Sequence, residues 1–342
     1  MKRFKIISLI LVYLIIAFIF LEILSRTFRT YNDTNPVYII QHPLLPYTML
    51  KNSKTKSILG NEISINSHGF RDYEYNKNKD EITYRILVLG DSTTYGYGIK
   101  MEHSYPKVLE NLLNKNFKDK KIEVLNLGVS GFNFIDYYNL YIEYGAQFQP
   151  DSIIIGAMRN DYVLNSLKVT IEDGVGKRPG SFWVRYNIPP FVLRILRNSG
   201  LYLVTGNALK NTKSIKNNNV SKINSELIES QNQKIDKVIS SYISKFNKIS
   251  DELNIPIYYL YLPSRLEVEL NKYTNKFHEK LQKNSRDKKN ITYIDMLKSV
   301  RKNSSRVEEI FTPQDGTHPT PFGHSIFANS IYNELLRQNI IK

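Results

Sequence analysis

The sequence predicts an α/β fold, a three-layer α/β/α sandwich with a central parallel sheet. From residue 86 onward, short apolar runs of the length of buried strands alternate with stretches whose apolar residues return at spacings of three and four. Such alternation is typical of a parallel sheet covered by helices on both faces. A long apolar segment near the start of the chain adds one predicted N-terminal transmembrane helix.

Each run of the predicted sheet is rich in Ile, Val and Leu and is followed closely by glycine, proline or a polar residue. The predicted strands are residues 86–89, 124–127, 153–156, 257–262 and 291–294. Apolar stripes predict helices around residues 108–113, 137–144, 235–253 and 326–335.

The N-terminal segment has the pattern of a membrane anchor. Residues 6–24 are apolar apart from Ser8, Tyr13 and Glu22, and three basic residues precede them. A helix of this length spans about 28 Å, close to the hydrocarbon thickness of a bilayer. Bulky residues at 20–24 favour an uncleaved anchor over a cleaved signal peptide. The basic start favours a cytoplasmic N-terminus, which predicts a single-pass protein with its main domain extracytoplasmic.

The sequence divides into three parts. Residues 1–25 are the anchor, residues 26–82 a tether with a short hairpin, and residues 83–342 the main domain. The hairpin, around residues 63–71 with a turn at Gly69, is expected to cover a sheet edge. An insertion at about 162–222 contains Trp183 and the segment 189–197; this segment is either a helix packed on the domain or a lid or membrane-facing surface.

Composition excludes several functional classes. The chain has no cysteine, so disulfides, thiolate zinc sites and cysteine nucleophiles are excluded. The net charge of +15 comes from basic residues scattered among polar and acidic ones, without the stacking aromatics of a nucleic-acid groove. We therefore expect no nucleic-acid partner, and we predict no cofactor and no metal. Two interpretations of the positive charge are left: it attracts the protein to anionic lipids or envelope polymers, or it has no role.

Two distant groups of residues carry the chemistry. Ser92 follows the first predicted strand as part of Gly90-Asp91-Ser92, where ligands of open α/β sheets bind. Asp315 and His318 lie together near the end of the chain. Serine needs a base to become a nucleophile, and an imidazole oriented by a carboxylate is the usual base. Each group also has a non-catalytic interpretation. Gly90-Asp91-Ser92 is a common turn sequence. Residues 315–319 can be a loop that leads into a helix capped by Thr317 or Thr320.

Two further segments match this chemistry, because acyl transfer requires N–H donors for a developing negative oxygen. Residues 126–131 follow the second strand, and Asn160-Asp161 follow the third. With these four blocks, residues 84–337 resemble the SGNH branch of the GDSL hydrolases, which implies a flavodoxin-like sheet.

The resemblance implies a role for each matching residue. Ser92 would be the nucleophile, His318 the general base and Asp315 its orienting partner. The N–H groups of Ser92 and Gly131, with the side chain of Asn160, would form the oxyanion hole. The third block departs from the family pattern, because Met158-Arg159 stands where a glycine usually precedes the asparagine. Either Asn160 still donates to the oxyanion, or the loop has moved and Arg159 contacts the substrate instead.

The sequence thus predicts a membrane-anchored, extracytoplasmic serine esterase or O-acyltransferase that uses a Ser-His-Asp acyl-enzyme mechanism. Its expected partner is an acylated carbohydrate or lipid-linked substrate, such as an ester of an envelope glycan or glycolipid. The alternative is a non-catalytic envelope protein that retains the fold for glycan binding or assembly. Tyr95 and Tyr97 are read either as sugar-stacking or as packing residues. The remaining histidines are expected at the surface or in caps: His42, His68, His103, His278 and His324.

Overall fold

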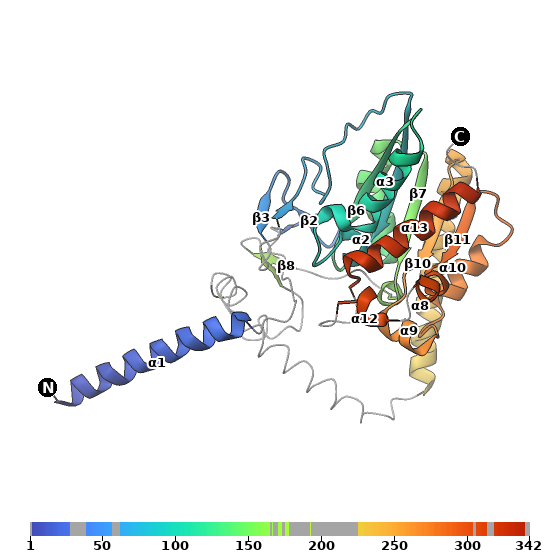
Figure 1. The fold of residues 1–342 in the computed structure, drawn as a ribbon. Coiled ribbons are helices and arrows are strands. Elements are labelled where there is room, and N and C mark those ends of the chain that lie inside the picture. Colours follow the sequence, from blue (N-terminus) through green and yellow to red (C-terminus); the bar gives the residue numbers. More distant parts are fainter. Residues whose placement is uncertain are drawn as a thin grey trace.

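The computed structural model places a single parallel sheet between two layers of helices (Figure 1). It describes residues 2–27, 39–56, 62–164, 166, 170–172, 175–177, 192, 225–303, 306–312 and 318–338. These include all five predicted strands and the four helices predicted between and after them.

The sheet has the strand order β11-β10-β7-β5-β6, and every neighbouring pair is parallel. This is the flavodoxin-like order, in which the chain winds outward from β5 in both directions and leaves a crevice at the carboxyl ends of the central strands. The strands are β5 (Thr83–Gly90), β6 (Lys121–Gly128), β7 (Ser152–Ala157), β10 (Ile257–Tyr261) and β11 (Ile291–Asp295).

Alternate residues of each strand enter one of two hydrophobic cores. Ile86 and Val88 pack in the core beneath α3 (Tyr105–Asn116), α11 (Met296–Asn303) and α13 (Pro321–Arg337). Leu87 and Leu89 pack in the opposite core, beneath α4 (Phe134–Leu140), α8 (Ser225–Leu253) and α10 (Phe277–Ser285). The apolar stripes seen in the sequence are therefore the sheet-facing sides of these helices.

Shorter elements complete the described part of the domain. A π-helical turn (Tyr141–Gly145) and a 3₁₀ turn (Ala146–Phe148) continue α4, and a 3₁₀ turn (Met101–His103) precedes α3. Helices α9 (Arg265–Leu270) and α12 (Val307–Ile310) lie near the ends of β10 and α13. Within the insertion, β8 (Thr170–Glu172) pairs with β9 (Val175–Lys177). Trp183 and residues 189–197, apart from Val192, lie outside the described residues.

The segment before the sheet packs into the core. β1 (Ile39–Ile40) pairs with β2 (Thr48–Met49), and β3 (Lys54–Lys56) pairs with β4 (Glu62–Ser64). The expected turn forms at Gly69, with φ at +93°. Three side chains of the predicted tether and three of the predicted hairpin are buried in the core beneath α4 and α8: Leu45, Tyr47 and Met49, and Ile63, Ile65 and Phe70.

Side-chain acceptors cover the outer edge of β6. The backbone N–H groups of Ile122, Val124 and Asn126 point away from the sheet and donate to side chains. Their acceptors are Asn114 Oδ1 at 3.0 Å, Glu110 Oε2 at 2.6 Å and Asp72 Oδ2 at 2.6 Å, respectively. Asp72 directly follows the predicted hairpin, so it is the residue after the hairpin that contacts this sheet edge.

Helix α1 (Lys2–Thr27) lies apart from the sheet domain (Figure 1). Its apolar side chains are exposed around the helix; Ile10, Leu14 and Phe18 are each more than half exposed, at 53%, 61% and 56%. Among the residues whose side chains the structure describes, no helix meets the combined length and hydropathy of a membrane span.

Candidate active site

Three aligned glycines make room for the serine at the carboxyl edge of the sheet. Gly90 and Gly128 are the last residues of β5 and β6, Gly156 is the last but one of β7, and the three lie side by side in the strand register. A Cβ atom at Gly128 would come within 2.3 Å of the backbone nitrogen of Tyr95, and one at Gly90 within 1.9 Å of Thr94 Oγ1. The absence of side chains at this glycine row lets helix α2 (Ser92–Tyr95) rest directly on the strand ends.

Asp91 fixes the start of α2. Its Oδ1 accepts a 2.9 Å hydrogen bond from the backbone N–H of Thr93, as an N-cap does. At the other end, Asn126 donates from Nδ2 to the carbonyl of Thr94 at 2.9 Å and accepts from the N–H of Gly128 at 2.9 Å. The second block therefore supports the helix that presents Ser92.

Arg71 fixes the turn that follows α2. Its guanidinium is buried and donates to the carbonyl oxygen of Gly96 at 2.6 Å and to that of Ile99 at 2.7 Å. It also lies over the ring of Tyr95 at 5.1 Å. Tyr95 is only 2% exposed, so it is a packing residue, and of the two sugar-stacking candidates only Tyr97 remains partly exposed.

The structure brings Ser92 and His318 together. Ser92 Oγ and His318 Nε2 are 2.8 Å apart, although 226 residues separate them in the sequence. The ring of Tyr97 packs against the imidazole at 4.6 Å between centroids. Asp315 lies outside the described residues, so its place beside His318 stays a prediction.

The loop that carries His318 is fastened to α12 and α13. The carbonyl of His318 accepts from the N–H of Thr312 at 2.9 Å, and Phe311 and Pro319 form a β-bridge. Thr320 caps α13, with its Oγ1 accepting from the N–H of Gly323 at 3.2 Å, and Pro321 occupies the first turn. The helix-capping and the catalytic interpretations of this segment are therefore compatible.

Asn160 and Ser92 both lie near the same carboxylate oxygen of Asp91. Asn160 sits in a 3₁₀ turn (Arg159–Asp161) after β7, and its Nδ2 donates to Asp91 Oδ2 at 3.2 Å. The same carboxylate oxygen is 3.5 Å from Ser92 Oγ. Burial raises the pKa of Asp91, while the bonds from Thr93 and Asn160 act in the opposite direction.

Met158 stands where the family usually has glycine, and its side chain fills the core under α2. It is 1% exposed, and its sulfur accepts from Thr93 Oγ1 at 3.0 Å. Its backbone N–H donates to Asp161 Oδ2 at 2.7 Å, and the hydroxyl of Tyr137 donates to the same oxygen at 2.9 Å. These contacts keep the turn beside Asp91 despite the departure from the glycine pattern.

Gly131 lies in the loop after β6, at the same sheet edge as Ser92. Its φ of +81° is in the left-handed region that favours glycine. The preceding carbonyl, that of Ser130, accepts a hydrogen bond from the hydroxyl of Tyr47. After this loop, Asn133 begins α4 with a capping box.

His324 is not at the surface, but it does act as a capping residue, because it accepts a hydrogen bond from the first N–H group of α3. It is fully buried in α13, and its Nδ1 accepts from the N–H of Tyr105 at 3.1 Å. Burial lowers its pKa to about 3. The sequence contained a signal, since His324 continues the stripe of Phe327, Ile331 and Leu335 at helical spacing. His42 does act as a cap, accepting from the N–H groups of Leu44 and Leu45.

Among the described residues, no cluster of three or more His, Asp or Glu side chains is placed to bind a metal ion.

A model of the GDSL-like lipase/acylhydrolase family matches residues 88–326, which contain all four blocks. The chain belongs to the GDSL-like lipase/acylhydrolase family. This confirms the resemblance noted in the sequence, and as a member of this family the chain is a GDSL-type ester hydrolase. No curated protein matches the sequence.

Several solved structures are similar to this GDSL-family chain. A lipolytic protein of the G-D-S-L family from Desulfitobacterium hafniense is 17% identical over 73% of this chain and 98% of its own, with a TM-score of 0.40. The family 3 carbohydrate esterase of Clostridium thermocellum is 14% identical over 75% of this chain and 99% of its own, with a TM-score of 0.44. A two-domain esterase active on acetylated mannans is 14% identical over 76% of this chain and 50% of its own, with a TM-score of 0.45.

Proposed function

We propose that this protein is a membrane-attached, extracytoplasmic serine esterase or O-acyltransferase that acts on acylated carbohydrate of the cell envelope. The observation that carries the catalytic part is the 2.8 Å contact between Ser92 Oγ and His318 Nε2. This is the distance that a nucleophile and its general base require.

In the proposed mechanism, Ser92 Oγ attacks the acyl carbon while His318 Nε2 accepts its proton. The N–H groups of Ser92 and Gly131 and the amide of Asn160 stabilise the negative oxygen of the tetrahedral intermediate. The intermediate collapses, the alcohol leaves with the proton from His318, and an ester on Ser92 remains. Asp315 orients the imidazole and stabilises its charged form.

The second half of the reaction decides between the two activities. His318 removes a proton from the acceptor oxygen, which attacks the ester on Ser92; the intermediate then collapses, the acyl group leaves on the acceptor, and His318 returns the proton to Ser92 Oγ. Water as the acceptor gives hydrolysis, and a sugar hydroxyl gives acyl transfer. Both activities use the same acyl-enzyme, so the described site serves either.

The proposed location rests on α1. Its apolar side chains are exposed around the helix, which is the surface that lipid covers. We propose that α1 attaches the protein to the membrane with the sheet domain outside the cytoplasm, where envelope glycans lie. A reporter fused after Lys342 should be active only outside the cytoplasm, and activity restricted to the cytoplasm would refute this location.

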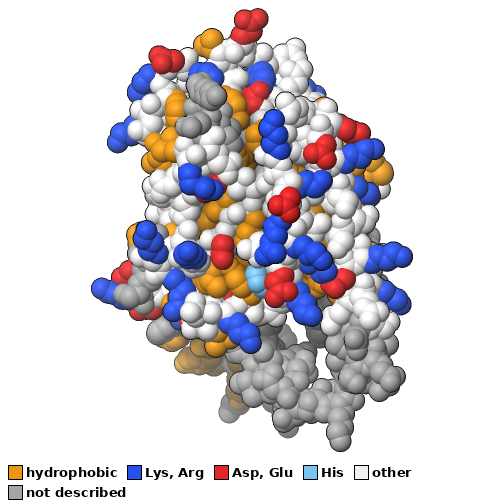
Figure 2. Space-filling model, turned by 90° about the vertical axis from the view of Figure 1, so that its right-hand side faces the viewer, with side chains coloured by type: hydrophobic (Ala, Val, Ile, Leu, Met, Phe, Trp, Pro, Cys, Tyr) orange, Lys and Arg blue, Asp and Glu red, His pale blue; other side chains and the backbone are white. Residues whose placement is uncertain are grey.

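A carbohydrate substrate is supported by Tyr97. Its ring lies against His318 and remains partly exposed, so it can stack on a sugar ring near the ester. Figure 2 shows Lys and Arg side chains spread over one face among Asp and Glu, without a continuous basic stripe. Some of the charges of the described residues form ion pairs, as in Lys280–Asp236 and Arg265–Glu269. This distribution fits our expectation that no nucleic acid is bound.

Labelling with a serine-directed fluorophosphonate tests the catalytic proposal. The wild-type protein should be labelled, and Ser92→Ala and His318→Ala should each reduce labelling to background. The double variant should be little worse than either, because the pair acts as a unit. Unchanged labelling of folded Ser92→Ala would refute the nucleophile, and an unlabelled wild type would favour a non-catalytic binding protein. Acetate release from O-acetylated polysaccharide, with and without an added saccharide acceptor, then separates hydrolysis from transfer.

A further inference from the structure

Tyr47 links the segment before the sheet to the loop after β6. Its hydroxyl donates to the backbone carbonyl of Ser130, 83 residues away in the sequence. The residue is 9% exposed, and its ring packs edge-on against Phe132 at 5.4 Å between centroids. The side chain is therefore held by packing, and its hydroxyl is aimed at one peptide group.

That peptide group also contains the Gly131 N–H, because the carbonyl of Ser130 and the nitrogen of Gly131 belong to the same planar unit. In a trans peptide the C=O and N–H bonds point in opposite directions. Glycine permits several backbone conformations, so this peptide plane is easily rotated when nothing holds it. The bond from Tyr47 fixes its oxygen on one side and so fixes the direction of the N–H on the other.

We propose that Tyr47 is a positioning residue for the reaction. Its hydroxyl aims the Gly131 N–H at the developing oxyanion and polarises the peptide so that this N–H is a stronger donor. The inference rests on the proposed function, in which Gly131 supplies part of the oxyanion hole. It gives a role in catalysis to a segment that precedes the family-matched residues 88–326.

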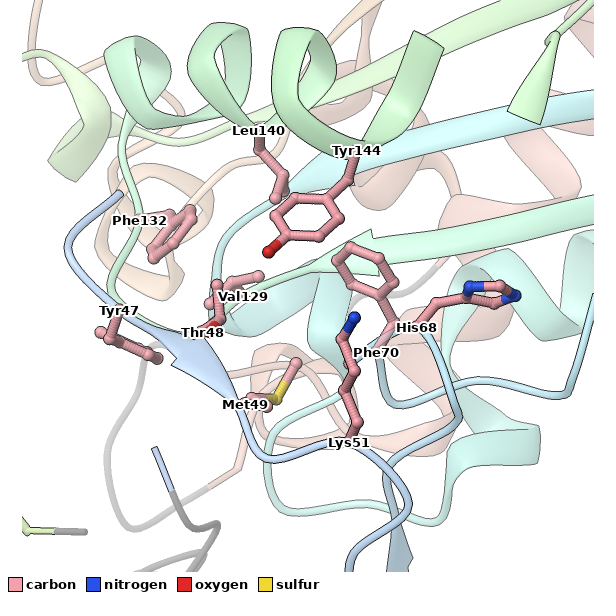
Figure 3. Close-up of a pocket in the computed structure, with 11 residues that line it drawn as sticks. Tyr47, Thr48, Met49, Lys51, His68, Phe70, Val129, Phe132, Leu140 and Tyr144 are labelled. Atoms are coloured by element: carbon pink, nitrogen blue, oxygen red, sulfur yellow. The ribbon is translucent and has the colours of Figure 1, made fainter. Parts of the chain in front are cut away.

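The surroundings of Tyr47 provide a matched control. Tyr47 and Tyr144 line the same small pocket, together with Met49, Phe70 and Val129 (Figure 3). Figure 3 shows the two tyrosines on different walls, with Tyr144 coming from the helical turn after α4. Removing the hydroxyl of Tyr144 changes the same pocket without removing the bond to Ser130.

The kinetic test compares Tyr47→Phe with Tyr144→Phe. For Tyr47→Phe, the rate of fluorophosphonate labelling and the kcat for 4-nitrophenyl acetate should each fall about tenfold, the scale of one orienting hydrogen bond. The KM should stay within twofold, because the bond acts on the transition state. Tyr144→Phe should match the wild type. A folded Tyr47→Phe protein with wild-type rates would overturn the proposal.

A second measurement does not depend on activity. Protein labelled with ¹⁵N-glycine contains sixteen glycines, and the Gly131 amide signal can be assigned by its loss in Gly131→Ala. Tyr47→Phe should shift or broaden this signal, and Tyr144→Phe should leave it unchanged. An unmoved Gly131 signal in Tyr47→Phe refutes the positioning role even if the wild type proves inactive. If the wild-type protein is not labelled by the fluorophosphonate but Tyr47→Phe still shifts the Gly131 signal, only the proposed function is refuted.

Discussion

Asp91 connects the nucleophile with the predicted oxyanion donor. One of its carboxylate oxygens caps α2, and the other accepts from the Asn160 side chain beside Ser92 Oγ. In this arrangement Asn160 Nδ2 is 3.2 Å from an Asp91 oxygen that is itself 3.5 Å from Ser92 Oγ. Catalytic hydrogen bonds often reach their final geometry only with substrate present.

This position of Asn160 leads to a prediction about the third block. Asn160→Ala should lower turnover by about a hundredfold or more, the scale of losing one oxyanion donor. The fold should be retained, because the Asn160 side chain is exposed. Arg159→Ala is the control, since the Arg159 side chain is also exposed and its carbonyl is held by Asn275 at 3.0 Å. Full activity in Asn160→Ala, with a defect in Arg159→Ala, would remove Asn160 from the mechanism.

His324 predicts a specific pH dependence of stability. Its pKa is lowered by burial from its ordinary value of 6.5 to about 3. Between these values the folded state binds fewer protons than the unfolded chain, so the free energy of unfolding falls as the pH falls. For one proton the loss from pH 6 to pH 4.5 is about 2 kcal/mol.

His324→Gln should remove this part of the pH dependence. Asp72 and Asp136, whose pKa values burial raises to about 6, act with the opposite sign over the same range and stay in both proteins. The difference between variant and wild type in urea unfolding at pH 6 and pH 4.5 therefore isolates the histidine. Equal pH dependence in the two proteins would show that His324 is protonated in the folded state.

At the scale of elements, the glycine row determines how closely α2 approaches the sheet. Gly128→Ala would place a Cβ atom 2.3 Å from the Tyr95 nitrogen and 2.6 Å from the Thr94 carbonyl carbon, so α2 must move. Misplacing a nucleophile by about 1 Å costs on the order of a hundredfold in rate. Turnover per folded molecule should fall by that scale.

Gly145→Ala serves as the control for this substitution. Its Cβ atom would meet the side chains of Leu87 and Tyr141, at 2.8 and 2.9 Å, in the core on the α4 side of the sheet. It should destabilise the protein by about 1–3 kcal/mol, as overpacking does, while leaving turnover per folded molecule unchanged. If both variants lose activity in proportion to their loss of stability, a displaced α2 is not the cause of the lower turnover of Gly128→Ala.

The five sheet strands and four of the helices could be predicted from the sequence, because each has a local apolar pattern, whereas the shorter sheet-covering helices α10 and α11 were not predicted. The glycine row could not, because its alignment depends on strand register, which brings Gly90, Gly128 and Gly156 together across three strands. The contact of Ser92 with His318 was predicted from chemistry and family resemblance. The contacts of Tyr47 and Arg71 were not, because they join residues far apart in the sequence and no local pattern indicates their partners.

At the scale of the whole molecule, the domain extends beyond the residues that match the family. Arg71, Asp72 and six buried apolar side chains lie before residue 76. Burying six such side chains contributes on the order of 10 kcal/mol, comparable with the entire stability of a typical domain.

Two truncations test this extent. A protein that begins at residue 39 should keep its thermal unfolding temperature and its activity, because the described apolar side chains of α1 are exposed. A protein that begins at residue 77 should be insoluble or should unfold without a cooperative transition. A stable, active fragment from residue 77 would show that residues 39–76 are dispensable, and circular dichroism melting of both fragments makes the comparison.

The covered edge of β6 limits how copies of this protein can associate. The outward N–H groups of Ile122, Val124 and Asn126 already donate to Asn114, Glu110 and Asp72, and that of Gly128 donates to the Asn126 side chain. A strand from another chain would have to displace four acceptors, two of them carboxylates, before it could pair here. Proteins crowded on one surface meet their neighbours often, so this side of the sheet is protected from fibre-like growth at high local density.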